Sequence, residues 1–168
     1  ESGLSQGEKH EIAGEVLSQG LRFYNGKTEE DAAKALAYFK EADKLGHMKA
    51  ARYIGLLYQE GRGVPKNDKE TASWFKKGAE DGDITSQYLL GKCYEDGTGV
   101  ERDYALALKW YRKSAERGDI IAAPGMTGEA LLLEKGLGGE RNLPLARQLL
   151  TKAAALGYAP AKEALAAL

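Results

Sequence analysis

The sequence predicts an all-α protein, a right-handed α–α superhelix (solenoid) of about four helix-turn-helix repeats with terminal cap helices. Three observations predict this fold. A motif recurs every 36 residues through the central part of the 168-residue chain. A glycine ends each copy, and the segments between the glycines carry apolar residues at helical spacing. We expect residues 1–168 to form a single domain.

The period is read from one aromatic position. Trp74 recurs as Trp110, 36 residues later, and the same step backwards reaches Tyr38. The step to the fourth copy is 39 residues, and Leu149 occupies its aromatic position. The predicted repeats cover residues of about 12–46, 47–82, 83–118 and 119–157, followed by a C-terminal cap helix over 158–168.

Positions that did not define the period support the alignment. A helix-capping residue type stands seven residues before the aromatic position in every copy: Asp31, Asn67, Asp103 and Asn142. A glycine stands eight residues after it, where a left-handed residue commonly ends a helix: Gly46, Gly82, Gly118 and Gly157. We therefore expect a second helix of about 14 residues in each repeat.

The packing within a repeat follows from the motif residues. Gly55 and Gly91 lie on the predicted first helices, where a missing side chain lets a partner helix approach closely. Trp74 and Trp110 are expected to be buried between helix pairs. An N-terminal helix is predicted over residues 5–24. The three extra residues of the fourth copy are expected either in its first helix or near Leu133.

The motif residues resemble those of a known repeat family. Tyr58 to Val64 and Tyr94 to Val100 both read Tyr-x-x-Gly-x-Gly-Val and are followed by Asn or Asp, a Trp-aromatic pair and Ala-x-x-Gly. This pattern is similar to the Sel-1-like repeat, a relative of the tetratricopeptide repeat. The first copy lacks the Gly-x-Gly-Val signature and is closer to a tetratricopeptide repeat. The fourth has Leu149-Leu150 in place of the aromatic pair.

Composition excludes several classes of function. Twenty-four basic and 25 acidic side chains leave a formal charge of −1, so the chain lacks the positive field that attracts nucleic acids. No apolar stretch approaches the roughly 20 residues that span a bilayer. The chain starts at Glu1 without a methionine, which fits a removed signal peptide, a removed tag or a fragment. On the first of these readings, a periplasmic or secreted location is favoured over a cytoplasmic one.

No catalytic residue, cofactor or metal site is predicted. Cys93 is the only cysteine, and neither His10 nor His47 is placed beside it by the repeat. His47 occupies the position after a helix-ending glycine and is expected to be a turn residue. The turns at 61–63 and 97–99 resemble phosphate-binding glycine loops, but no strand precedes them, and positive φ angles at the glycines explain them better.

The sequence instead predicts a surface that binds another protein or peptide. The expected concave face carries residues from the first helices of the second and third repeats that the motif does not require. These candidate partner-binding residues are Arg52, Leu56, Gln59, Tyr88, Lys92 and Glu95. Aromatic, aliphatic and arginine side chains together are typical of protein-binding hot spots. We expect a monomer that binds one partner.

The resemblance implies adaptor, receptor or inhibitor and immunity-type roles, the last of these in bacteria. Two other readings stay open. A cysteine-rich branch of the family is linked with β-lactam binding and hydrolysis, but that branch has a disulfide in each repeat, which a chain with only Cys93 cannot form. The chain is alternatively a structural spacer within a longer array.

Overall fold

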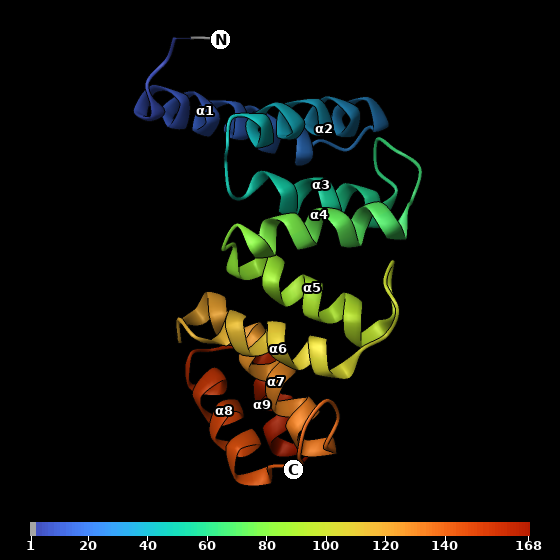
Figure 1. Ribbon diagram of the computed structural model, residues 1–168, viewed down its shortest axis with the longest axis vertical. Coiled ribbons are helices and arrows are strands. Elements are labelled where there is room, and N and C mark those ends of the chain that lie inside the picture. Colours follow the sequence, from blue (N-terminus) through green and yellow to red (C-terminus); the bar gives the residue numbers. More distant parts are fainter. Residues whose placement is uncertain (1–2) are drawn as a thin grey trace. The chain divides into compact units, whose positions relative to one another are not determined.

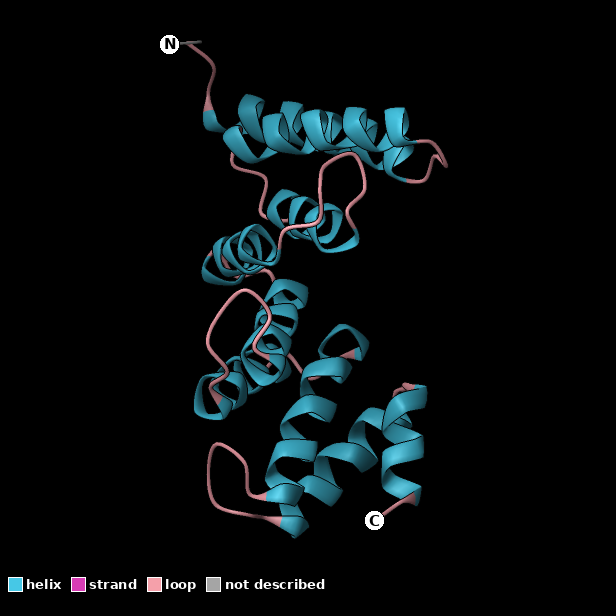
Figure 2. Cartoon of the chain, turned by 90° about the vertical axis from the view of Figure 1, so that its right-hand side faces the viewer, coloured by secondary structure: helices cyan, strands magenta, loops and turns pink. Residues whose placement is uncertain are grey.

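The computed structural model describes residues 3–168, and over this range the chain contains helices, turns and loops but no strand (Figure 2). This confirms the all-α prediction. The chain divides into two compact units, one ending at Asp83 and the other spanning Ile84–Leu168. Each unit has its own buried apolar core.

The first unit consists of two helical hairpins (Figure 1). Helix α1 (Gln6–Tyr24) packs along α2 (Glu29–Lys44), and α3 (Ala50–Glu60) packs along α4 (Asp68–Glu80). Contacts between α2 and α3 join the two hairpins. The predicted N-terminal helix is confirmed, because Ser5 accepts a hydrogen bond from the Glu8 amide at 3.1 Å and caps α1.

The second unit repeats this arrangement and adds a last helix. Its elements are α5 (Ile84–Asp96), α6 (Tyr104–Ala115), the 3₁₀ helix η1 (Ile120–Ala122), α7 (Ala123–Lys135), α8 (Leu143–Ala155) and α9 (Ala159–Ala166). The hairpins α5–α6 and α7–α8 pack through α6 and α7, and α9 packs against α8 and α7.

The predicted caps are confirmed in three repeats and wrong in the first. Asn67, Asp103 and Asn142 each accept a hydrogen bond from the backbone amide three residues ahead, at 3.0–3.1 Å. In the first repeat the cap is Thr28, and Asp31 is the third residue of α2. Thr28 and Asp31 form a reciprocal capping box, which starts the helix earlier than the repeat alignment predicts.

The helix-ending glycines behave as expected. Their φ angles lie in the left-handed region, between 75° at Gly118 and 99° at Gly82. The turn glycines Gly61, Gly63, Gly97 and Gly99 also have positive φ angles, between 65° and 73°. This backbone requirement accounts for the Gly-x-Gly motif without a phosphate ligand.

A close contact between a glycine and an aromatic ring holds the two helices of a hairpin together. A methyl group placed on Gly55 would lie 2.5 Å from the Phe75 ring, and one on Gly91 would lie 2.7 Å from the Tyr111 ring. Both rings are buried, with 0% and 1% of their residue surface exposed. Only a residue without a side chain fits beneath these rings.

The buried aromatic residue is therefore the one after the predicted core tryptophan. Trp74 and Trp110 are only half-buried, so the expectation that they fill the core is wrong. Trp74 lies at the side of the hairpin, where its Nε1 donates to Glu70 at 3.0 Å and Lys77 lies over the ring. One step along a helix turns a side chain by about 100°, so that Phe75, not Trp74, points at Gly55.

The three extra residues of the fourth repeat are located by the helix ends. Gly97 ends α5 and Gly136 ends α7, 39 residues later, so α5 and α7 align without a gap. The insertion therefore precedes α7 and forms η1. This excludes a position near Leu133. Two isoleucines of η1, Ile120 and Ile121, are each 50% exposed.

Candidate functional site

The six predicted partner-binding residues lie on two helices, three in each unit. Arg52, Leu56 and Gln59 are on α3, and Tyr88, Lys92 and Glu95 are on α5. In both helices they lie at intervals of three, four or seven residues, which places them along one stripe. Lys92 is exposed and the other five are partly buried.

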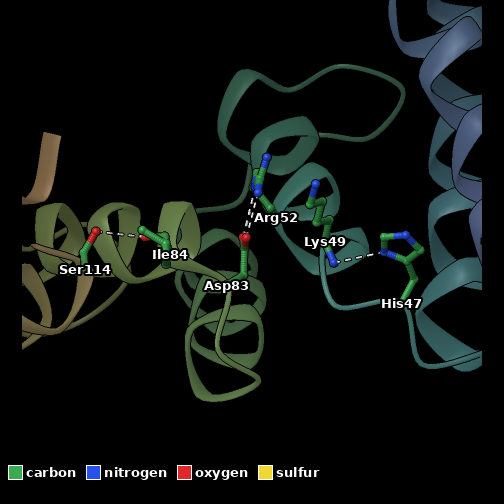
Figure 3. Close-up of polar contacts among 6 residues, drawn as sticks. All are labelled: His47, Lys49, Arg52, Asp83, Ile84 and Ser114. Atoms are coloured by element: carbon green, nitrogen blue, oxygen red, sulfur yellow. Dashed lines mark hydrogen bonds and ion pairs between the residues drawn. The ribbon is translucent and has the colours of Figure 1, made fainter. Parts of the chain in front are cut away.

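Arg52 has a structural partner that the sequence analysis missed. Its Nε donates to one carboxylate oxygen of Asp83 at 3.0 Å and its Nη2 to the other at 2.6 Å (Figure 3). The guanidinium also lies over the Tyr53 ring, 5.3 Å from its centroid. Burial lowers the pKa of Arg52, but Asp83 outweighs this effect and raises it. The assumption that Arg52 has no structural role is therefore wrong.

The two-pronged ion pair ties α3 to the residue that follows the glycine at the end of α4. Asp83 is 3% exposed, so its carboxylate depends on protein donors in place of water. Close to this pair, His47 accepts a hydrogen bond from the Lys49 amide at its Nδ1, at 3.2 Å (Figure 3). His47 is thus a turn residue, as predicted. Burial, followed by the charge of Lys49, lowers its pKa.

In the second unit, Tyr88 and Glu95 lie on either side of a buried tyrosine. The Tyr111 hydroxyl donates to Glu95 at 2.7 Å, and the ring centroids of Tyr88 and Tyr111 are 5.8 Å apart. Burial is the main cause that raises the pKa of Tyr111, and Glu95 adds to it. Tyr88 also packs against the core of this unit, so its ring contributes to stability as well as to the surface.

Tyr158, at the start of α9, lies near the same face. Burial raises its pKa, and the neighbouring groups that change it further are Tyr88, which raises it, and Lys92, which lowers it. Lys92 itself pairs weakly with Asp96 at 4.0 Å. The stripe on α5 therefore continues toward α9.

Leu131 on α7 belongs to this surface and was not predicted. It is 37% exposed, which is unusual for a leucine in this chain. It stands 39 residues after Lys92, which itself stands 36 after Leu56, so the three residues occupy one repeat position. The signal was present in the sequence, but the unplaced three-residue insertion concealed the register of α7.

The structure offers no support for an active site among the residues it describes. Cys93 is 3% exposed within α5. Over residues 3–168 no group of three or more histidine, cysteine, aspartate or glutamate side chains is arranged to hold a metal ion. In the same range, no helix combines the length and the apolar character that crossing a bilayer requires.

Successive helical hairpins with small-residue contacts and left-handed glycine turns define an α-helical repeat protein. The Sel1 repeat model matches the chain in four stretches, residues 16–47, 49–83, 84–119 and 126–158. The chain belongs to the Sel1 repeat family. The first and fourth repeats, which depart most from the motif, are both included in the match.

Solved structures support the same assignment. A protective antigen of uropathogenic Escherichia coli with an SLR fold is 31% identical over 92% of this chain, with a TM-score of 0.79. A Sel1 repeat protein from Oxalobacter formigenes is 30% identical over 91%, with a TM-score of 0.81. The present chain spans 34% of the length of the first and 62% of the second.

Cysteine-rich protein B of Helicobacter pylori shares the fold. It is 23% identical over 83% of this chain and 98% of its own length, with a TM-score of 0.62. Comparison with curated proteins gives no significant match. Sel1 repeats generally act as protein–protein interaction modules and non-enzymatic scaffolds.

Proposed function

We propose that this chain binds a partner protein through the stripe on its first helices, in an adaptor or inhibitor type of role. The observation that carries the proposal is the exposed Leu131, which leaves an aliphatic side chain in solvent beside partly buried tyrosines. Apolar side chains bordered by charged ones supply the buried centre and polar rim of a protein interface.

The test must avoid residues that hold the fold together. Arg52 is unsuitable because its replacement would leave the Asp83 carboxylate buried without its main partner. Leu56→Lys combined with Leu131→Lys is better suited, because Lys92 occupies the same repeat position and lysine is compatible with the helix there. The matched control is Lys109→Glu with Lys113→Glu, two exposed residues of α6.

The experiment is capture of partners by the wild-type chain, followed by affinity measurement on the purified partner. We expect the Leu56→Lys, Leu131→Lys variant to lose about thirtyfold in affinity, the effect of about 2 kcal/mol at a hot spot. Its helicity and melting temperature should stay close to those of the wild type. If the α6 control abolishes binding while the leucine variant binds normally, the proposed surface is wrong.

A further inference from the structure

An open pocket of about 330 Å³ lies in the second unit, between the C-terminal ends of α5 and α7. Tyr104, Leu131 and Leu137 contribute apolar walls, and Glu95, Arg102 and Lys135 are among its polar residues. Glu95 and Leu131 also belong to the stripe described above. The pocket therefore extends the candidate surface toward the start of α6.

Arg102 lines this pocket because it does not bond to the helix end that its counterparts cap. The equivalent residues are Lys66, 36 positions earlier, and Arg141, 39 positions later. Lys66 donates to the Gln59 carbonyl at 2.9 Å, and Arg141 donates to the Glu134 carbonyl at 2.9 Å. Both of these side chains satisfy a free carbonyl at the end of a first helix.

The side chain of Arg102 instead lies over the Tyr104 ring, 5.3 Å from its centroid. In the second repeat the counterpart of Tyr104 is Asp68, which pairs with Lys66 at 3.4 Å. The third repeat thus has an aromatic ring where the second has a carboxylate. Arg102 is held by a ring face, an interaction that leaves its hydrogen-bond donors available to a ligand.

Lys135 brings a second positive charge to a position that is acidic in the preceding repeats. Its counterparts are Asp96 and Glu60, and Glu60 lies 3.6 Å from Arg62. Within residues 3–168, neither Lys135 nor Arg102 has a carboxylate partner. The two cations at this pocket are therefore uncompensated.

The carboxylates of the pocket already have donors. Glu95 accepts the Tyr111 hydroxyl at 2.7 Å, and Asp96 has Lys92 at 4.0 Å. The charge available to a ligand is consequently positive, beside an apolar wall. We propose that this pocket binds a peptide segment of the partner in which a leucine-sized side chain is followed by a carboxylate. The apolar side chain contacts Leu131, and the carboxylate meets Arg102 and Lys135. This rests on the proposed protein-binding function.

The test uses two capped peptides, acetyl-Gly-Leu-Asp-Gly-amide and acetyl-Gly-Leu-Lys-Gly-amide, titrated into the ¹⁵N-labelled full chain. We expect the aspartate peptide to shift the amide signals of Tyr104, Leu131 and Leu137 saturably. Affinity for the lysine peptide should be at least about tenfold weaker, since opposite charge is replaced by like charge at two cations. Arg102→Gln with Lys135→Gln should weaken the aspartate peptide to the level of the lysine peptide.

Lys66→Gln with Lys69→Gln is the matched control, because it removes the same charge from the first unit and should leave the titration unchanged. Equal binding of both peptides, no saturable shift, or the same shifts on concentrating the chain alone would overturn the pocket assignment. These results leave the proposed function intact if the leucine variant still loses its partner. A selective peptide titration combined with unaffected partner binding in the leucine variant would instead refute the proposed surface.

Discussion

The ring of Tyr111 lies on the backbone of Gly91, so closely that a methyl group at Gly91 would be 2.7 Å from two ring carbons. The fourth repeat has the same contact in another form. Ala130 and Leu150, each 39 residues after its counterpart, are both fully buried in one core. A smaller side chain on the second helix accompanies a larger one on the first.

This relationship predicts a compensating pair of substitutions. Gly91→Ala should destabilise the fold by about 1–3 kcal/mol, because a methyl group is forced against a packed ring. Tyr111→Leu should also destabilise it, since the ring and its bond to Glu95 are lost. In the double variant, which copies the pair Ala130 and Leu150, the cost of the alanine should largely disappear. Urea unfolding of the four proteins measures the coupling, and additive losses would show that the two sites are independent.

Adjacent aromatic residues of α6 should differ sharply in their contribution to stability. Tyr111→Ala is expected to cost about 3–5 kcal/mol, the range for truncating a buried aromatic residue. Trp110→Ala should cost clearly less, because Trp110 is half-buried and Lys109 lies over its ring. Chemical denaturation of the two variants is the measurement. A larger loss at Trp110 would contradict the register of α6.

The ion pair between Arg52 and Asp83 should be strongly coupled. Arg52→Ala is expected to destabilise by about 3–5 kcal/mol, because a nearly buried carboxylate loses a two-pronged partner. Arg52→Ala with Asp83→Asn should be more stable than Arg52→Ala alone, since no buried charge then remains unpaired. Thermal melts at neutral pH distinguish this from a surface pair, for which both losses would be below about 1 kcal/mol.

The period and the helical spacing were sufficient to predict the fold, because a repeated hairpin can bury its apolar face only against its neighbours. The ends of α2 and the buried aromatic residue were missed for local reasons. Thr28 and Asp31 form a capping box that the period does not contain. Trp74 and Phe75 are both apolar, and only the position of Gly55 shows which of them faces the partner helix.

The surface was harder to predict than the fold. The stripe positions follow from the repeat, but the partners of their side chains do not. Arg52 reaches Asp83 across 31 residues of sequence. The pocket beside Arg102 depends on Tyr104 standing where Asp68 stands in the preceding repeat, a difference whose effect on the arginine is visible only in three dimensions.

The carboxyl of Glu129 should make the fold less stable as the pH rises through the mildly acidic range. Burial raises its pKa above the usual value of 4.5, although a hydrogen bond with Arg112 at 3.2 Å opposes this. The folded state therefore keeps its proton to a higher pH than the unfolded state does. Stability contributed by the neutral carboxyl is fully present below the unfolded pKa and is lost as the pH rises through the folded pKa.

Glu129→Gln removes this titration while keeping the shape of the side chain. We expect the stability of the variant relative to the wild type to increase between about pH 4 and pH 7, because only the wild type must ionise a buried group. Urea unfolding at several pH values measures the difference. Arg112→Gln is the companion variant, and without the opposing cation it should steepen the loss of stability with pH. A relative stability of Glu129→Gln that falls over this range would show that the ion pair with Arg112 outweighs burial.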